Sequence, residues 1–284
     1  MAFCDSFQAL AHRLQCHLLR RHRTQLKPLG RVQFACLLQS LPAAPLPGPP
    51  ATGADRIAIV VHLHYADLWP ALSARLQAQP FPFTLLVTVT GEAVKQAIAA
   101  DVAQSFPDAD IIVMENRGRD VLPFLRLLAE GKLASYDLVC KLHAKKSPHR
   151  RDGTRWRDVA LDSLIGQTNG AALFAADPAL GMLGPAKYAF QQGPHLGANG
   201  PWLRWLIARF GIGRAAADGE FFAGTMFWVR TDALASLAPL ARDPDILSRF
   251  EAEKGQIDGT LAHAVERVLP MVVRQSGWRV AAQK

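Results

Sequence analysis

Between residues 56 and 143, apolar stretches rich in β-branched residues alternate with longer stretches of helical periodicity, and this alternation limits the possible folds more than any other feature. The expected strands are 56–64, 83–90, 109–116 and 137–143, and the expected helices are 67–79, 91–106 and 120–131. Strands connected through helices run parallel and are covered on both faces of their sheet. The sequence therefore predicts an α/β domain with a mostly parallel central sheet and helices on both faces.

The rest of the chain adds elements around this unit. Further helices are expected over 153–166, 200–211, 231–237 and 258–269, and further strands over 181–185 and 219–230. Thr231 is the expected cap of one of these helices, and Asp258 stands at the start of another. Upstream, residues 2–24 have a helical pattern, and residues 41–55 are too rich in proline and glycine for a helix or a central strand. We therefore divide the chain into a basic helical segment (1–40), a linker (41–55) and an α/β domain (56–284).

Composition excludes several classes of protein. The chain has 284 residues, of which 50% are hydrophobic, and this is enough for a packed core. No apolar run is long enough for a transmembrane helix and the first residues lack the pattern of a secretion signal, so we expect a cytoplasmic protein. The four cysteines are scattered along the sequence, which predicts neither disulfides nor a cysteine-built zinc site.

The net charge of +8 is concentrated in two patches. Residues 117–157 hold eleven Lys or Arg against four Asp or Glu, and residues 1–31 hold six against one. Such patches favour anionic partners, which include phosphorylated small molecules, nucleic acid and anionic lipid. Because only 8% of the residues are aromatic and no recognised nucleic-acid motif is present, we expect no nucleic acid partner. The helix 2–24 either packs on the domain or lies on the inner face of the cytoplasmic membrane, and both interpretations stay open.

Polar and basic side chains follow the expected strands at their carboxyl ends, where ligands of parallel sheets bind. The first group is His64, Tyr65, Thr90, Asn116, Arg117, Gly118, Arg119 and Asp120. The second group, at the end of the strand 137–143, is Lys141, His143, Lys145 and Lys146. Because parallel strands end at the same edge of a sheet, we expect the two groups to converge on one site.

The stretch E-N-R-G-R-D-V follows a strand and opens a helix. Gly118 permits close approach of a ligand, and the two arginines beside it offer fork-shaped donors to phosphate. The amino terminus of the following helix adds a further preference for an anion. The stretch matches neither the G-x-G-x-x-G nor the G-x-x-x-x-G-K-[ST] pattern, which leaves those two nucleotide-binding classes unsupported.

The stretch L-H-A-K-K ends the fourth expected strand. Nucleotide-sugar transferases of the GT-A type often carry L-D-A-D-D at the corresponding place, where the aspartates hold a divalent cation against the donor diphosphate. In this chain Lys145 and Lys146 stand where acids would be, so protein cations would replace the metal, and we expect no metal cofactor. The D-x-D sequence of Asp108 and Asp110 precedes its strand, at the opposite edge, and is expected to be a turn.

Glycosyl transfer also needs a base that deprotonates the acceptor hydroxyl, and a carboxylate is the usual choice. Asp258, at the start of its helix, is the first candidate, and Glu220 is the second. A plain helix cap is an equally open interpretation of Asp258. His263 and Glu266 lie three residues apart on one helix face, where they either bind the acceptor sugar or pair with each other.

Five ordered blocks of this sequence together resemble the rhamnan synthesis protein F family, bacterial proteins of cell-surface polysaccharide assembly. The blocks are H-L-H-Y-A-D-L-W, E-N-R-G-R-D-V-L-P-F-L, Y-D-L-V-C-K-L-H-A-K-K-S-P-H, G-E-F-F-A-G-T-M-F-W and D-G-T-L-A-H-A-V-E-R-V-L-P, and the resemblance covers roughly residues 57–270. The family is associated with rhamnose-containing glycans and is regarded as glycosyltransferase-like.

The resemblance implies a GT-A-like nucleotide-sugar fold. The implied activity is transfer of a deoxyhexose from a nucleotide-diphosphate sugar to a lipid-linked or polysaccharide acceptor, with rhamnose as the first candidate for the sugar. Other glycosyltransferases are the implied partners. The alternative is a module that binds a sugar or a nucleotide sugar without turnover and supports a partner enzyme.

Overall fold

The computed structural model describes residues 27–43, 46, 55–144, 153–166 and 170–283. The predicted helix 2–24, most of the linker, and the pair Lys145 and Lys146 lie outside the described residues.

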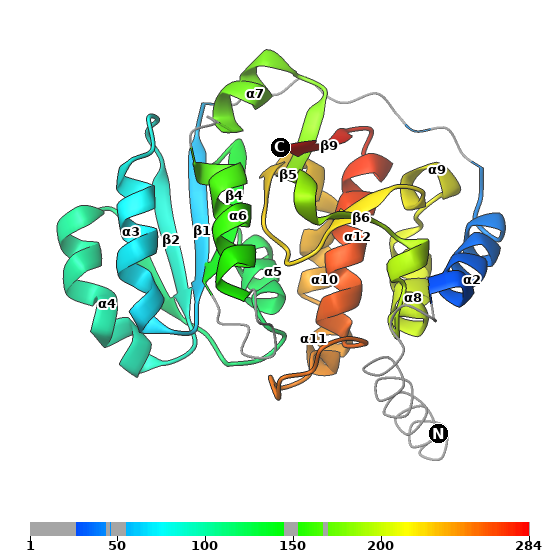
Figure 1. The fold of residues 1–284 in the computed structure, drawn as a ribbon, viewed down its shortest axis with the longest axis horizontal. Coiled ribbons are helices and arrows are strands. Elements are labelled where there is room, and N and C mark those ends of the chain that lie inside the picture. The colour runs from blue at the N-terminus through cyan, green and yellow to red at the C-terminus, as the bar shows by residue number, and fades with distance from the viewer. Residues whose placement is uncertain (1–26, 44–45, 47–54, 145–152, 167–169, 284) are drawn as a thin grey trace.

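Seven strands of the described chain form the central sheet, in the order β3-β2-β1-β4-β8-β5-β9 (Figure 1). Their bounds are β1 (Ile57–Leu63), β2 (Thr84–Val89), β3 (Asp110–Val113), β4 (Leu138–Ala144), β5 (Leu180–Pro185), β8 (Phe227–Arg230) and β9 (Arg279–Gln283). All neighbouring strands pair in parallel except at β8, which runs antiparallel to both β4 and β5. The predicted mostly parallel sheet is confirmed.

Helices cover both faces of this sheet, as predicted. One face carries α3 (Trp69–Gln77), α4 (Glu92–Ser105), α6 (Gly153–Ile165) and α7 (Gly170–Ala176), and the other carries α5 (Val121–Ala129), α8 (Gly200–Phe210) and α12 (Leu261–Gln275). Successive strand residues belong to opposite cores: Ile59 packs with α3 and α4, and Val60 packs with α5. This alternation matters for the site, because even-numbered residues of β1 and β2 and odd-numbered residues of β4 face α5 and α12.

Shorter elements complete the molecule. These are α2 (Lys27–Gln39), α9 (Arg214–Ala217), α10 (Ala238–Ala241), α11 (Pro244–Arg249), the 3₁₀ turns η1 (Ala66–Leu68), η2 (Ala186–Tyr188), η3 (Gly193–His195) and η4 (Asp232–Leu237), and a separate antiparallel pair of β6 (Ala189–Gln191) and β7 (Glu220–Phe222). Most of them lie around the α5 and α12 face, while η1 contacts α3 and α4 and η2 contacts α6 on the other face. α2 falls within the predicted helical segment 1–40.

Three local predictions were wrong. The expected strand 219–230 is two strands in two sheets, because Gly224 and Thr225 adopt positive φ angles of 97° and 56° and turn the chain between β7 and β8. The expected helix 231–237 is a 3₁₀ turn, and Thr231 makes no side-chain capping hydrogen bond. The last helix begins at Leu261 rather than at residue 258, because the Thr260 side chain accepts the His263 N–H as its N-cap.

Candidate active site

Polar side chains of β1, β2 and β4 meet on one face of the sheet at its carboxyl edge. His62 pairs in register with Thr88 on one side and with His143 on the other. All three side chains are buried, and His62 Nδ1 lies 2.9 Å from Thr88 Oγ1. One layer further out, His64 Nδ1 lies 2.8 Å from Thr90 Oγ1, and the Tyr65 ring meets His64 edge to face. The strand-end residues His64, Tyr65, Thr90 and His143 therefore lie at the same edge of the sheet, as expected for parallel strands.

Beneath this surface, Lys141 and Asp120 form a buried ion pair. Lys141 Nζ lies 2.6 Å from Asp120 Oδ2, and the two side chains are 1% and 5% exposed. Nζ also donates to the Thr225 carbonyl at 2.8 Å and lies over the rings of Phe124 and Phe227. One lysine thus connects β4, the start of α5 and the β7–β8 turn, and it faces the protein interior.

The loop from β3 to α5 is anchored to the segment that precedes α12. Gly118 and Arg119 both have left-handed φ angles near 60°. The Arg117 guanidinium donates to the carbonyls of Phe250 (2.6 Å), Ser248 (2.8 Å) and Leu247 (3.1 Å), which end α11. The exposed Asn116 accepts the Glu253 N–H through its carbonyl at 3.3 Å.

Arg119 continues this connection to the first turn of α12. Its Nε lies 3.2 Å from Glu253 Oε2, and it donates to the Gln256 carbonyl at 3.3 Å. It also contacts His263 Nε2, while His263 Nδ1 lies 2.7 Å from Thr260 Oγ1. Arg119 and His263, which are 144 residues apart in sequence, therefore lie together where α5 and α12 both begin.

Glu266 and His143 fix the turn between β7 and β8. Glu266 Oε2 accepts the Gly224 N–H at 2.6 Å and the Thr225 hydroxyl at 2.9 Å. His143 Nε2 lies 2.7 Å from the Gly224 carbonyl, and since a carbonyl only accepts, Nε2 carries the proton in this contact. The strained turn is held from β4 on one side and from α12 on the other.

Trp156 belongs to this site and was missed by the sequence reasoning. Its half-buried ring lies nearly parallel to His143, with the centroids 6.4 Å apart, and packs on Tyr188 at 4.5 Å. The ring edge rests on Gly224, where an added Cβ would come within 1.9 Å of it. In the sequence, the position of Trp156 just after the basic stretch that follows β4 was the one signal that could have placed it near the site.

The two predicted bases lie at different places. Asp258 is 7% exposed, and its carboxylate accepts the Asn199 Nδ2–H at 2.6 Å and the Ala198 N–H at 3.2 Å, two residues before the α12 cap. Glu220 lies at the other end of α12, where its carbonyl accepts from Arg274 at 2.7 Å, a guanidinium whose pKa burial lowers to about 10. The structure brings Asp258 to the α12 amino terminus, and it does not bring Glu220 there.

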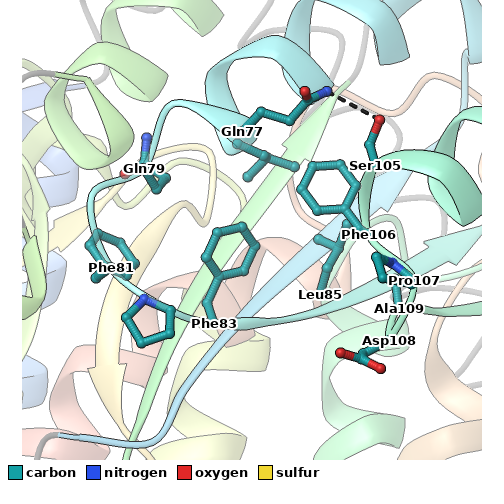
Figure 2. Close-up of a pocket in the computed structure, with 12 residues that line it drawn as sticks. Gln77, Gln79, Phe81, Phe83, Leu85, Ser105, Phe106, Pro107, Asp108 and Ala109 are labelled. Atoms are coloured by element: carbon teal, nitrogen blue, oxygen red, sulfur yellow. Dashed lines mark hydrogen bonds between the residues drawn. The ribbon is translucent and has the colours of Figure 1, made fainter.

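The pocket drawn in Figure 2 lies at the opposite, amino edge of the sheet. It has a volume of about 430 Å³, and its lining includes the polar side chains of Gln77 and Gln79 beside the rings of Phe81, Phe83 and Phe106. Asp108 lies at this edge in the turn before β3, as predicted. None of the predicted site residues lines this pocket.

Comparison with known proteins identifies the chain. The model of a family described as rhamnan synthesis protein F matches residues 48–278. The chain belongs to the rhamnan synthesis protein F family. The sequence-based resemblance is thereby confirmed, and membership connects the chain with polysaccharide biosynthesis.

Two curated proteins that are similar to this chain come from Xanthomonas campestris pv. campestris, strains B100 and ATCC 33913 / DSM 3586 / NCPPB 528 / LMG 568 / P 25. Each is called uncharacterized protein WxcX and is 35% identical over 225 residues. The match covers 78% of this chain but 32% of each relative, so the chain spans about a third of their length.

Among solved structures, CMP:2-keto-3-deoxy-manno-octonic acid synthetase in complex with CTP is similar at a TM-score of 0.39 and 13% identity, over 80% of this chain and 91% of that chain. Within the described ranges, no helix is both long and apolar enough to cross a membrane.

Proposed function

We propose that this member of the rhamnan synthesis protein F family is a glycosyltransferase domain with a GT-A-like fold. It transfers a deoxyhexose, for which rhamnose is the first candidate, from a nucleotide-diphosphate sugar to a lipid-linked or polysaccharide acceptor. The observation that carries the proposal is the convergence of the strand-end histidines with the amino termini of α5 and α12 at one edge, joined by the contact of Arg119 with His263. Family membership supports the connection to polysaccharide biosynthesis.

The donor diphosphate would bind where these two helices begin. Helix amino termini offer unpaired N–H groups and partial positive charge to an anion. Arg117, Arg119 and His143 supply further positive or donor groups, and Lys145 and Lys146, outside the described residues, would complete the set. His64, Tyr65, Thr90 and Asn116 would contact the nucleoside or the sugar.

The buried pair of Lys141 and Asp120 would act through position rather than contact. Asp120 immediately precedes α5, and Lys141 holds both that aspartate and the Thr225 carbonyl. The pair therefore sets the relative placement of the anion-binding loop and the β7–β8 turn. His263 and Glu266, on the adjacent turn of α12, would face the acceptor sugar.

Asp258 is the proposed base, and the test compares it with Glu220. Asp258→Asn should lower turnover at least about a hundredfold, in the range of general-base removal, with donor affinity by calorimetry within about threefold of the parent. Glu220→Gln is the matched control and should retain turnover, because Glu220 lies at the far end of α12. Equal losses in both variants would remove Asp258 from this function.

Because the asparagine amide would meet the donors Ala198 N–H and Asn199 Nδ2–H, Asp258→Asn also loses stability, by about 1–3 kcal/mol. Activity is therefore measured well below the melting temperature of the variant. A folded variant that binds donor but does not transfer sugar supports the base.

Transfer is proposed to need no divalent metal, since lysines stand at the place of the acidic motif. Nucleotide-diphosphate sugars are screened for thermal stabilisation of the protein, once with EDTA and once with Mg²⁺ or Mn²⁺. The screen identifies the donor, and it also tests whether donor binding needs a divalent metal. Abolition of transfer by EDTA and its recovery with Mn²⁺ would refute metal independence.

A binding module without turnover is the second candidate, and one observation favours it. The charged side chains Arg117, Arg119 and Asp258 are all engaged by protein groups. Such a module would bind the nucleotide sugar in calorimetry while the parent protein shows no transfer to any acceptor, and Asp258→Asn would then change neither property.

The proposed place of action is the cytoplasm, at the inner face of the membrane where a lipid-linked acceptor is exposed. Because the chain spans about a third of its curated relatives, other glycosyltransferase domains are the proposed partners.

A further inference from the structure

α2 is apolar on two opposite faces, although a surface helix needs only one. Its inner face packs through the buried Phe34 and Leu37. Gly30 fits against η3 so closely that an added Cβ would lie 2.6 Å from the Gly193 carbonyl oxygen. This close contact fixes the orientation of α2 on the domain.

The outer face of α2 exposes aliphatic side chains. Leu29 is 53% exposed and Val32 is 62% exposed, and they follow each other at helical spacing. Ala35 and Cys36, both exposed, extend the same stripe by one turn. The described residues have four exposed large hydrophobic side chains, and two of them lie together here.

The surroundings of this stripe are basic. α2, η3 and α8 contain Lys27, Arg31, Arg204 and Arg209 and no Asp or Glu. Arg209 is paired with Asp243, while α8 adds the half-buried rings of Trp202 and Trp205. α2 and α8 lie side by side, at the end of the molecule away from α4 (Figure 1).

We propose that the outer face of α2, defined by Leu29, Val32, Ala35 and Cys36 with Lys27 and Arg31 beside them, docks on an anionic lipid bilayer. An interfacial helix buries an aliphatic stripe at the boundary between headgroups and acyl chains while basic side chains meet anionic headgroups, and α2 presents this combination. The charge distribution selects a lipid surface over a second copy of the chain, because two such faces would bring like charges together.

The proposed membrane contact is a property separate from the proposed glycosyl transfer, so the experiment that tests it needs neither donor nor acceptor. The full chain is sedimented with vesicles of three parts phosphatidylethanolamine to one part phosphatidylglycerol, and with phosphatidylcholine vesicles. We expect binding to the anionic vesicles and at least about tenfold weaker binding to the neutral ones. Val32→Asp should weaken anionic binding about tenfold or more, because it replaces an inserted methyl pair by a charge. Arg31→Glu should weaken it at least about fivefold.

Each variant has a matched control. Val113, 36% exposed on β3 at the other end of the sheet, receives the same change as Val113→Asp, and the exposed Lys132 is changed to Glu. Both controls should bind vesicles like the parent protein. Absence of parent binding, or an equal loss in the controls, would overturn the proposal.

The reactivity of Cys36 tests two other possible occupants of the outer face of α2, which are another part of this chain and a second copy of it. In a variant with Cys4 and Cys16 changed to Ser, the exposed Cys36 should react quickly with maleimide while the buried Cys140 does not. Anionic vesicles should protect Cys36. A Cys36 that is unreactive without vesicles would show that the chain itself or a second copy covers α2, and would overturn the lipid assignment. Normal transfer by Val32→Asp to a water-soluble acceptor separates this result from the fate of the proposed activity.

Discussion

At the scale of single residues, Gly224 is the most constrained position of the candidate site. It has a φ of 97°, and an added Cβ would come within 1.9 Å of the Trp156 ring. Gly224→Ala should destabilise the fold by about 3 kcal/mol, since it adds overpacking to the cost of a left-handed backbone. Urea unfolding measures the change.

Gly131→Ala is the control for this prediction. Gly131 has a φ of 75° with nothing within 4 Å of an added Cβ, so its replacement isolates the backbone cost of about 1 kcal/mol. Equal losses at both positions would show that Trp156 does not pack on the turn.

Lys141 is the second residue at which the structure allows a sharp prediction. Lys141→Met should cost about 3–5 kcal/mol, because the buried Asp120 carboxylate loses the ammonium group that lies 2.6 Å from it. The double variant Lys141→Met with Asp120→Leu should regain at least half of that loss, since no uncompensated charge remains. A double-mutant cycle by urea denaturation gives the coupling, and additive losses would contradict a direct pair.

The sequence predicted at which edge of the sheet these side chains lie, but it did not predict which side chains they contact. Parallel strands end at one edge, so His64, Thr90 and His143 could be assigned to one site from spacing alone. The partner of Lys141 could not be predicted, because Asp120 reaches it across the start of α5, a contact set by tertiary packing. The same holds for the contact of Arg119 with His263.

At the scale of elements, apolar runs bounded by turn residues predicted the strands, and the failure at 219–230 has a physical cause. The run reads as one strand because both halves are apolar, yet the positive φ angles of Gly224 and Thr225 turn the chain so that the halves join different sheets. The capping signal of α12 was also misassigned. Thr260 rather than Asp258 makes the cap, and Asp258 instead joins the α12 start to the turn before α8.

The starts of β1 and β4 are held together by Arg56 and Asp137, which yields a pH prediction. The Arg56 guanidinium, 2.6 Å away, and nearby backbone N–H groups hold the pKa of Asp137 below its ordinary value of 3.8. A lowered folded-state pKa stabilises the fold above the unfolded pKa, and this contribution is lost as pH falls through the folded pKa. Asp137→Asn should cost about 1 kcal/mol at pH 7, a modest value because Arg56 is solvent-exposed.

The cost of Asp137→Asn should therefore begin to shrink below about pH 4, where the carboxyl of the unfolded parent gains its proton, and should continue to shrink as the pH falls through the lowered folded-state pKa. Chemical denaturation at pH 7, 5 and 3 provides the comparison. The exposed Asp108, changed to Asn, is the control and should show no such trend. A cost for Asp137→Asn that stays constant from pH 7 to pH 3 would contradict the ionic contribution.

At the scale of the whole molecule, the candidate site and the pocket of Figure 2 lie at opposite edges of the central sheet, the carboxyl and the amino edge. The alternation of strands and helices predicted the layers and the meeting of the strand-end side chains at the carboxyl edge. It did not predict the antiparallel β8, because a four-residue strand carries no directional signal, nor the pocket of Figure 2, whose wall comes from two loops.

This separation gives a prediction for hydrogen exchange with pyrophosphate as a probe of the diphosphate site. At four times the dissociation constant, exchange should slow about fivefold in residues 115–122 and 257–264, where α5 and α12 begin. The loops 78–83 and 106–109 at the amino edge serve as the internal control and should be unchanged. Protection confined to those loops would place the anion in the pocket of Figure 2 instead. Protection at the starts of both helices, lost in Arg119→Ala but kept in Arg279→Ala, would show that Arg119 holds the two termini in the geometry that binds the anion.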